Sequence, residues 1–166
     1  MFYQPRGYTL MVKLNLGCPY RCDGYICVDL SPKDPGVVEA DVYDYLRAHS
    51  ENAVEEIYTK NLLEHLGNPL EFLRLCYREL KPSGKITLTT DNAEYLPFYL
   101  PFWVNHTGIG AHSRREYASL KEHGGGRHFM VFTKMHLENL LEEAGFRKIE
   151  VARVWMGSRL RAIAIK

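Results

Sequence analysis

Several common patterns are missing from this sequence of 166 residues. No apolar run approaches the roughly 20 residues that cross a bilayer, so we expect no membrane partner. Lysine and arginine exceed aspartate and glutamate by a single charge, so the composition does not favour a nucleic-acid partner. The opening stretch MFYQPRGYTLMVKLNLG lacks a charged-then-apolar signal pattern, and we therefore expect a cytoplasmic protein.

The sequence has four cysteines, and the spacing of the first three is irregular. Cys18, Cys22 and Cys27 are separated by three and then four residues. This spacing matches neither the regular zinc motifs nor the three-cysteine signature of radical iron–sulfur enzymes. Cys27 also falls in an apolar segment, where cysteine packs as a small hydrophobic residue. We therefore predict free thiols and no bound metal.

The chain length fits one domain, and short strand-like segments alternate with helical patterns. Helices are predicted after Asn68, which precedes Pro69 and Glu71 in a capping-box pattern, and after Thr133. Strands are predicted from apolar and β-branched runs at 12–16, 25–28, 37–38, 54–59 and 85–90. This alternation predicts an α/β fold with a mostly parallel sheet.

The C-terminal segment follows a different pattern. Residues 148–155 and 159–165 alternate in polarity, and the short stretch Met156-Gly157-Ser158 separates them. Two alternating strands joined by a tight turn form an antiparallel hairpin. We therefore expect the sheet to end in an antiparallel pair.

Polar residues follow the predicted parallel strands at the points where ligands bind in such sheets. Gly17 follows the first strand and lets a ligand approach the backbone closely. Asp29 ends the second strand and can accept both hydroxyls of a ribose, and Asp41 follows the third. The glycine-rich signatures of phosphate binding are absent. The pattern therefore indicates a ligand that contains adenosine but no pyrophosphate.

Four segments, taken together, resemble the class I S-adenosylmethionine-dependent methyltransferases, in particular the small, type 11-like ones. They cover most of the chain in the order of that family. The segments are LNLGC with GYICVDL (14–18, 24–30), EADVYDYL (39–46), NLLEHLGNPLEFLRLCYRELKPSGKITLTT (61–90) and FTKMHLENLLEEAGFRKIEV (132–151). The resemblance implies a Rossmann-like, doubly wound sheet of about seven strands with an antiparallel last strand.

The resemblance also implies a set of residues that bind S-adenosyl-L-methionine. Asn15, Gly17 and Cys18 would lie at the methionine part of the cofactor. The adenosine part would meet residues that follow the second, third and fourth strands: Asp29 at the ribose, Leu30, Asp41 and Val42 at the adenine, and Lys60 and Asn61 beside them.

The sequence departs from the family pattern in the first loop. Pro19 stands where a second glycine is usual, and proline has no backbone N–H and a fixed φ. Asn15 replaces the usual acidic residue, so it offers no charge to the cofactor's amino group. Residues 18–24 are too few for a crossover helix, which needs about a dozen residues. We therefore expect a trimmed domain with short or absent N-terminal helices.

Residues 101–132 show little periodicity and contain several histidines, so we interpret this segment as a substrate lid or insertion within a single domain of residues 1–166. A sulfonium methyl group is already activated, and a general base is needed only for a protonated nucleophile. Asp91, His106 and His128 are the candidates for that base.

The expected function is methyl transfer from S-adenosylmethionine to an acceptor, either a small molecule or a macromolecule, that the sequence does not identify. Two alternatives stay open. One is a non-catalytic, methyltransferase-like binding or regulatory module, and the other is a different enzyme that binds adenosine or a nucleotide. The trimmed first loop also makes a homodimer plausible.

Overall fold

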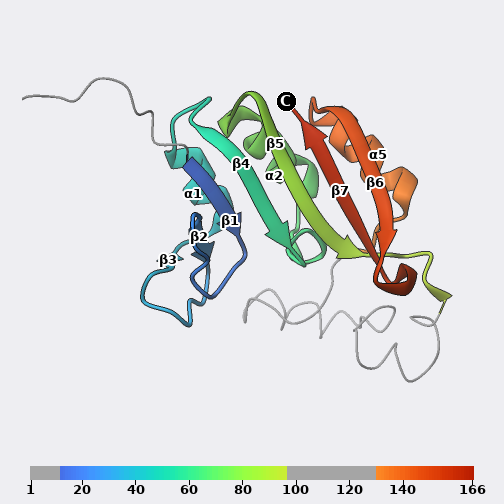
Figure 1. Cartoon of the computed structure of the whole chain (residues 1–166), viewed down its shortest axis with the longest axis horizontal. Coiled ribbons are helices and arrows are strands. Elements are labelled where there is room, and N and C mark those ends of the chain that lie inside the picture. The colour runs from blue at the N-terminus through green and yellow to red at the C-terminus, as the bar shows by residue number, and fades with distance from the viewer. Residues whose placement is uncertain (1–11, 97–129) are drawn as a thin grey trace, which may run out of the picture.

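A sheet of seven strands, in the order β3-β2-β1-β4-β5-β7-β6, forms the centre of the molecule. The computed structural model describes residues 12–96 and 130–166 (Figure 1). Strands β1 to β5 pair in parallel, whereas β7 runs antiparallel to both β5 and β6. The strands are β1 (Val12–Leu16), β2 (Ile26–Asp29), β3 (Val38–Glu39), β4 (Val54–Lys60), β5 (Leu80–Asp91), β6 (Arg147–Val154) and β7 (Arg159–Ile165).

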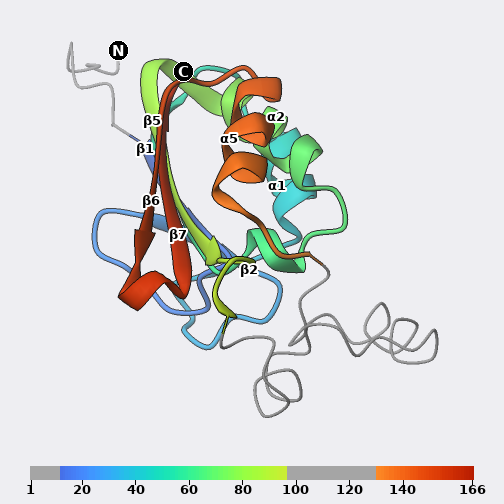
Figure 2. The same ribbon diagram turned by 90° about the vertical axis from the view of Figure 1, so that its right-hand side faces the viewer.

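The described α-helices all lie on one face of the sheet (Figure 2). They are α1 (Val42–Ala48), α2 (Pro69–Glu79) and α5 (Lys134–Glu143), and short 3-10 turns form η1 (Leu63–His65) and η3 (Trp155–Gly157). Residues 17–25 connect β1 to β2, and residues 30–37 connect β2 to β3. Both connections are too short for a crossover helix. Within the described residues, the second face of the sheet therefore carries no helix.

The hydrophobic core lies between the sheet and these helices. Leu14 and Leu16 of β1 are fully buried in one cluster with Phe72 and Leu73 of α2 and Leu137 of α5. Side chains alternate between the two faces of a strand. Residues between the core-facing leucines, such as Asn15, therefore point to the helix-free face.

Side-chain caps set the helix ends as the sequence predicts. The Asn68 Oδ1 accepts a hydrogen bond from the backbone N–H of Glu71 at 3.2 Å, and the Asn68 Nδ2 donates to the Glu71 Oε2 at 3.2 Å. The predicted N-cap is therefore confirmed, but the capping box is incomplete: Glu71 returns to the side-chain amide of Asn68, whereas the Asn68 backbone N–H donates to the Tyr43 hydroxyl at 3.3 Å. Thr133 caps α5 through its Oγ1, which accepts from the N–H of His136 at 3.1 Å.

Charged side chains occupy the helix-free face at the middle of the sheet. Lys13 of β1 and Lys85 of β5 flank Glu56 of β4, with N–O distances of 3.3 Å and 3.1 Å. Burial works against ionisation of Glu56, but the hydrogen bonds from Lys85 and Lys13 outweigh it and lower the pKa of the carboxyl group. Three neighbouring strands thus share one charge network, which we call the Lys13–Glu56–Lys85 network.

The structure confirms the predicted fold class, including the antiparallel C-terminal pair and the missing helix between β1 and β2. It differs at residues 81–84, which lie outside the strand predicted at 85–90. These residues belong to β5, with a register irregularity against β4 and a left-handed Ser83 at φ 65°. In the described part of the chain, no helix is long and apolar enough to cross a bilayer.

Candidate functional site

The candidate site is the edge of the sheet where the parallel strands β1, β2, β3, β4 and β5 have their carboxyl ends. Because neighbouring parallel strands end at the same edge, residues distant in the sequence come together there. The edge has two parts. Residues that follow β1, β2 and β3 form the first part, and residues that follow β4 and β5 form the second together with the turn between β6 and β7.

Gly17 begins the first part of the edge in a backbone conformation that favours glycine. Its φ is +73°, and its N–H donates to the carbonyl oxygen of Val28 at 2.8 Å. A Cβ atom at this position would lie only 2.9 Å from the Cδ1 atom of Leu62, in the segment that follows β4. Both the left-handed turn and the close packing therefore require glycine here.

Asn15 and Cys18 contact the β1–β2 loop itself. Asn15 is 6% exposed, and its Nδ2 donates to the Cys22 Sγ at 3.3 Å. The Cys18 thiol donates to the carbonyl oxygen of Tyr20 at 3.1 Å, and its sulfur lies 3.7 Å from that of Cys22. Burial raises the pKa of the Cys18 thiol and raises the pKa of Cys27 to about 11. The predicted contacts of Asn15 and Cys18 with a cofactor stay predictions.

Asp29 lies half-buried at the carboxyl end of β2. Its Oδ1 accepts a hydrogen bond from the N–H of Ser31 at 2.8 Å, which holds the carboxylate in a short turn. Leu30 follows with 60% of its surface exposed, and it offers an apolar surface beside the carboxylate. An oriented carboxylate next to an apolar side chain suits a ribose with its attached base.

Asp41 is the N-cap of α1. Its Oδ1 accepts from the N–H groups of Tyr43 at 2.8 Å and Asp44 at 3.2 Å. Val42 is 5% exposed and its side chain belongs to the core. The predicted contact of Val42 with adenine can therefore come only from its backbone, since its side chain packs inward.

Lys60 and Asn61 contact the turn between β6 and β7 at the second part of the edge. The Lys60 ammonium lies 5.0 Å from the ring centre of Trp155, and the Arg159 guanidinium lies 5.1 Å from it. Arg159 also donates to the Asn61 Oδ1 and pairs with the buried Asp91 at 3.7 Å. The structure thus groups these predicted residues with cationic and aromatic side chains that the sequence did not indicate.

Glu64 is a further candidate that sequence reasoning missed. It lies in η1, directly after β4, and is completely buried. Its Oε2 accepts from the Thr90 hydroxyl at 2.8 Å, whereas its Oε1 has no hydrogen-bond partner among the described residues. Burial raises the pKa of Glu64, and the charge of Asp91 adds to this effect. The signal available in the sequence was its position just after a parallel strand, in NLLEH.

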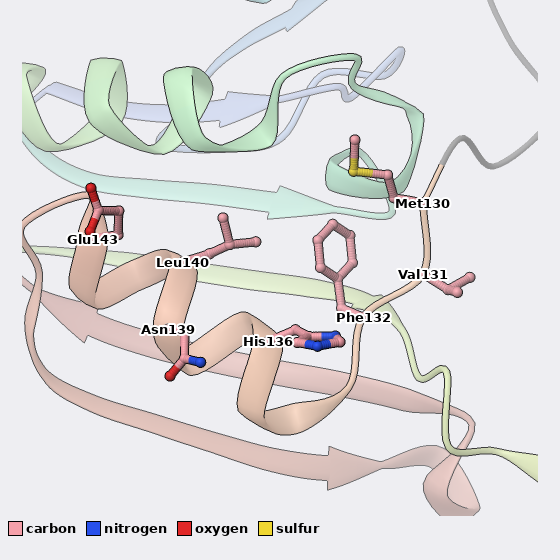
Figure 3. A pocket seen from close by; sticks show the side chains of 7 residues that line it. All are labelled: Met130, Val131, Phe132, His136, Asn139, Leu140 and Glu143. Carbon is pink, nitrogen blue, oxygen red and sulfur yellow. The ribbon is translucent and has the colours of Figure 1, made fainter.

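His106 and His128 lie outside the described residues, as does the predicted lid except for residues 130–132. Those three residues contribute to a cavity of about 620 Å³ beside α5 (Figure 3). The other lining residues come from α5: His136, Asn139, Leu140 and Glu143. This largely apolar cavity is lined by none of the predicted site residues. We therefore locate the candidate site at the edge of the sheet, where the predicted polar residues lie, and not at this cavity.

A family model for a methyltransferase domain matches residues 17–151, and the chain belongs to this family. The fold agrees with that of solved S-adenosylmethionine-dependent methyltransferases. One, from Archaeoglobus fulgidus, is 17% identical and superposes with a TM-score of 0.64 over 94% of this chain and 86% of the other. No curated protein sequence matches the chain.

Two other solved structures have the same fold and larger chains. One is the 1,6-didemethyltoxoflavin-N1-methyltransferase of Burkholderia thailandensis, solved with bound 1,6-didemethyltoxoflavin and S-adenosylhomocysteine. It is 17% identical to this chain and superposes with a TM-score of 0.63 over 93% of this chain and 70% of its own. Phosphoethanolamine N-methyltransferase 2 of Haemonchus contortus, in complex with S-adenosyl-L-methionine, is 16% identical with a TM-score of 0.61. That match covers 94% of this chain but only 48% of the other.

We expect Gly17→Ala to lower the free energy of unfolding more than Gly24→Ala does. Both glycines have positive φ, at 73° and 80°, so both substitutions carry a backbone cost of about 1–2 kcal/mol. Only the Cβ at position 17 would also crowd Leu62, since nothing lies within 4 Å of position 24. Urea denaturation of the two variants measures the difference, and equal losses would contradict the packing argument.

Glu64→Gln should become more stabilising as the pH rises. The folded pKa of Glu64 is raised above 4.5, so its contribution to stability is present below about that pH and is lost as the pH rises through the folded pKa. Unfolding free energies of the wild type and the variant, measured between about pH 4 and 7, should diverge with increasing pH. Glu150→Gln, at an exposed site, is the control. A constant difference for Glu64→Gln would contradict the burial argument.

Asp41→Ala should lower the unfolding free energy by about 1 kcal/mol because it removes the N-cap of α1. Asp41→Asn should preserve the stability, since asparagine caps helices as well as aspartate does. Thermal denaturation of both variants separates the capping role from any role of the negative charge. A stability loss in the asparagine variant equal to that of the alanine variant would show that the cap is not what Asp41 contributes.

Proposed function

We propose that this chain binds S-adenosyl-L-methionine at the first part of the edge and transfers its methyl group to an acceptor held at the second part. The observation that carries the proposal is the position of Asp29. Its carboxylate is half-buried at the end of β2 and is oriented by the N–H of Ser31. In the sequence, Asp29 lies between the turn at Gly17 and the N-cap of α1 at Asp41. The family to which the chain belongs and the bound cofactors of its fold relatives support the choice of ligand.

The adenosine part of the cofactor is assigned to the residues that follow β2 and β3. Asp29 would accept hydrogen bonds from the ribose hydroxyls, and a charged acceptor makes such bonds stronger. The exposed Leu30 would pack against the adenine. The Asp41 side chain caps α1 by accepting from the N–H groups of Tyr43 and Asp44, and the N–H of Val42 does not take part in this cap. Together with the Asp41 carboxylate, this N–H would meet the polar edge of the base.

The methionine part is assigned to the turn at the end of β1. Gly17 leaves the backbone open to a close approach by the ligand. Asn15 lies beneath this turn, with its amide nitrogen bound to Cys22, and its remaining amide oxygen would accept from the cofactor's amino group. Cys18 would complete the contact through its backbone. The β1–β2 loop thus takes the place of the longer glycine-rich turn.

Catalysis would consist mainly of positioning. The sulfonium methyl group is electrophilic, so the residues need to align the acceptor with the methyl–sulfur bond and exclude water. The acceptor's electron pair forms the new bond to carbon, and the electrons of the carbon–sulfur bond leave with sulfur. Lys60, Asn61 and Arg159 border the position of the acceptor. If the acceptor arrives protonated, we propose Asp91, His106 and His128 as candidates for the base, and we add Glu64, which lies after β4.

One observation favours the alternative of a non-catalytic binding module. The β1–β2 connection is short and contains Pro19, so one wall of the usual cofactor site is reduced. Such a domain would bind the cofactor or a partner without turnover, or would need a second copy to complete the wall. Production of S-adenosylhomocysteine from S-adenosylmethionine separates the two functions, since a binding module forms none.

S-adenosylhomocysteine should raise the melting temperature of the purified protein. A ligand at a hundred times its Kd stabilises the folded state by about 2.7 kcal/mol, which corresponds to several degrees for a domain of this size. Asp29→Asn should weaken binding by roughly ten- to a hundredfold, because it removes the charge but keeps an oxygen for Ser31. Calorimetric titration measures this loss.

Asp34→Asn is the matched control for this experiment. Asp34 also accepts a hydrogen bond two residues ahead, from the N–H of Gly36 at 2.9 Å, but it lies in the β2–β3 loop and not at a strand end. Its substitution should leave the affinity for S-adenosylhomocysteine unchanged. The ribose assignment would be wrong if both asparagine variants bound as tightly as the wild type.

A further inference from the structure

We propose that Cys18, Cys22 and Cys27 bind one Zn²⁺ ion, which holds the β1–β2 loop against the helix-free face of the sheet. This inference goes beyond the proposed methyl transfer and does not depend on it. The earlier expectation of no metal rested on the spacing of the cysteines along the chain. Their arrangement in space leads to a different conclusion.

The fold brings the three sulfur atoms together from two elements. Cys18 and Cys22 belong to the loop, whereas Cys27 lies on β2 in register with Asn15 of β1. All three sulfur atoms lie within 4.8 Å of one another, and Cys18 and Cys22 are 3.7 Å apart. Since Asn15 points to the helix-free face, its partner Cys27 does too, and the loop folds over them there.

The distance between the Cys18 and Cys22 sulfur atoms suits metal coordination better than a disulfide. Tetrahedral zinc with bonds of about 2.3 Å to sulfur places its sulfur ligands about 3.8 Å apart. The observed separation of Cys18 and Cys22 is within about 0.1 Å of that value. A disulfide requires about 2.05 Å, so the same two atoms would have to move together by well over 1 Å. Three thiolates leave one position on zinc for water or another ligand.

One hydrogen-bond donor beside the cluster suits a bound thiolate. The Asn15 Nδ2 donates to the Cys22 sulfur at 3.3 Å, and hydrogen bonds of this kind orient and stabilise metal ligands. Cys27 is buried at 1% exposure, and Cys18 and Cys22 are half-buried. One side of the site is thus closed by the sheet, while the loop side leaves a path for an ion to enter.

The loop has little else to hold it in place. Its side chains at Tyr20, Arg21 and Asp23 are exposed, so no apolar core forms beneath it. The start of the loop is held by the N–H groups of Gly17 and Cys18, which donate to the Val28 carbonyl at 2.8 Å and 3.3 Å. The rest of the loop makes one backbone bond to the chain outside it, from Lys33 N–H to the Pro19 carbonyl at 2.8 Å, and one within itself, from Tyr25 N–H to the Cys22 carbonyl at 3.2 Å. Small units without a core are commonly stabilised by a metal ion. Here the ion would stand in for the missing crossover helix.

The experiment uses the full chain, purified under reducing conditions. Elemental analysis should find one zinc per chain, and Co²⁺ added to the metal-free protein should give the charge-transfer and ligand-field bands of a tetrahedral cobalt–thiolate site. Zinc should also raise the melting temperature of the metal-free protein. Cys22→Ser and Cys18→Ser should each lose the cobalt spectrum and most of the affinity for zinc, with the far-ultraviolet circular dichroism unchanged.

Cys76→Ala is the matched control, because Cys76 is fully buried in α2 and is not part of the cluster. It should keep one zinc and the cobalt spectrum. The proposal is overturned if the reduced wild type binds no stoichiometric Zn²⁺ or Co²⁺, or if both serine variants bind as the wild type does. A Cys18–Cys22 disulfide in protein kept from oxidants, seen as a mass lower by two hydrogens, would also overturn it. S-adenosylhomocysteine binding is measured separately on the metal-free protein, so failure of either proposal is recognised on its own.

Discussion

The short connection between β1 and β2 is the constraint on which much of this structure depends. Nine residues, 17–25, link two adjacent parallel strands, and no helix fits in that length. The chain therefore turns sharply at Gly17, folds over the helix-free face of the sheet and returns as β2. Among the described residues, no helix covers one face of the sheet, and contacts among Asn15 and three cysteines take the place of the packing that a helix would provide. Gly17 and Cys18 of the candidate cofactor site belong to this connection.

The fold was largely predictable from the sequence, because it follows from local signals and hydrophobic periodicity. The cap at Asn68 and the polarity alternation after residue 147 placed α2 and the C-terminal hairpin correctly. The segment 81–84 was predicted less well. A lysine, a proline, a serine and a glycine indicate a turn, yet β5 continues through them, with the left-handed Ser83, because Leu80 and Lys85 on either side both pair with β4. Tertiary pairing outweighed local preference there.

The candidate site was predictable from the sequence only where a residue suited to ligand binding directly follows or ends a predicted strand. Asp29 and Gly17 belong to that class, since position alone brings them to the edge. The role of Glu64 depends on complete burial and on a hydroxyl from β5, and neither can be read from the local sequence. The cysteines show the same limit: spacing along the chain argued against a shared site, but the register of β1 with β2 brings the sulfur atoms together.

The Lys13–Glu56–Lys85 network has a consequence for how copies of this protein meet. Within residues 12–96 and 130–166 one face of the sheet carries no helix, and a sheet face without helices is prone to stack on another sheet. Stacking would take these three ionised groups out of water, and the cost of removing a charge from water is several kcal/mol. The two lysines of one copy would also face those of the other. The network thus acts as a gatekeeper against sheet-on-sheet aggregation, and it favours association, if copies pair, through a different surface.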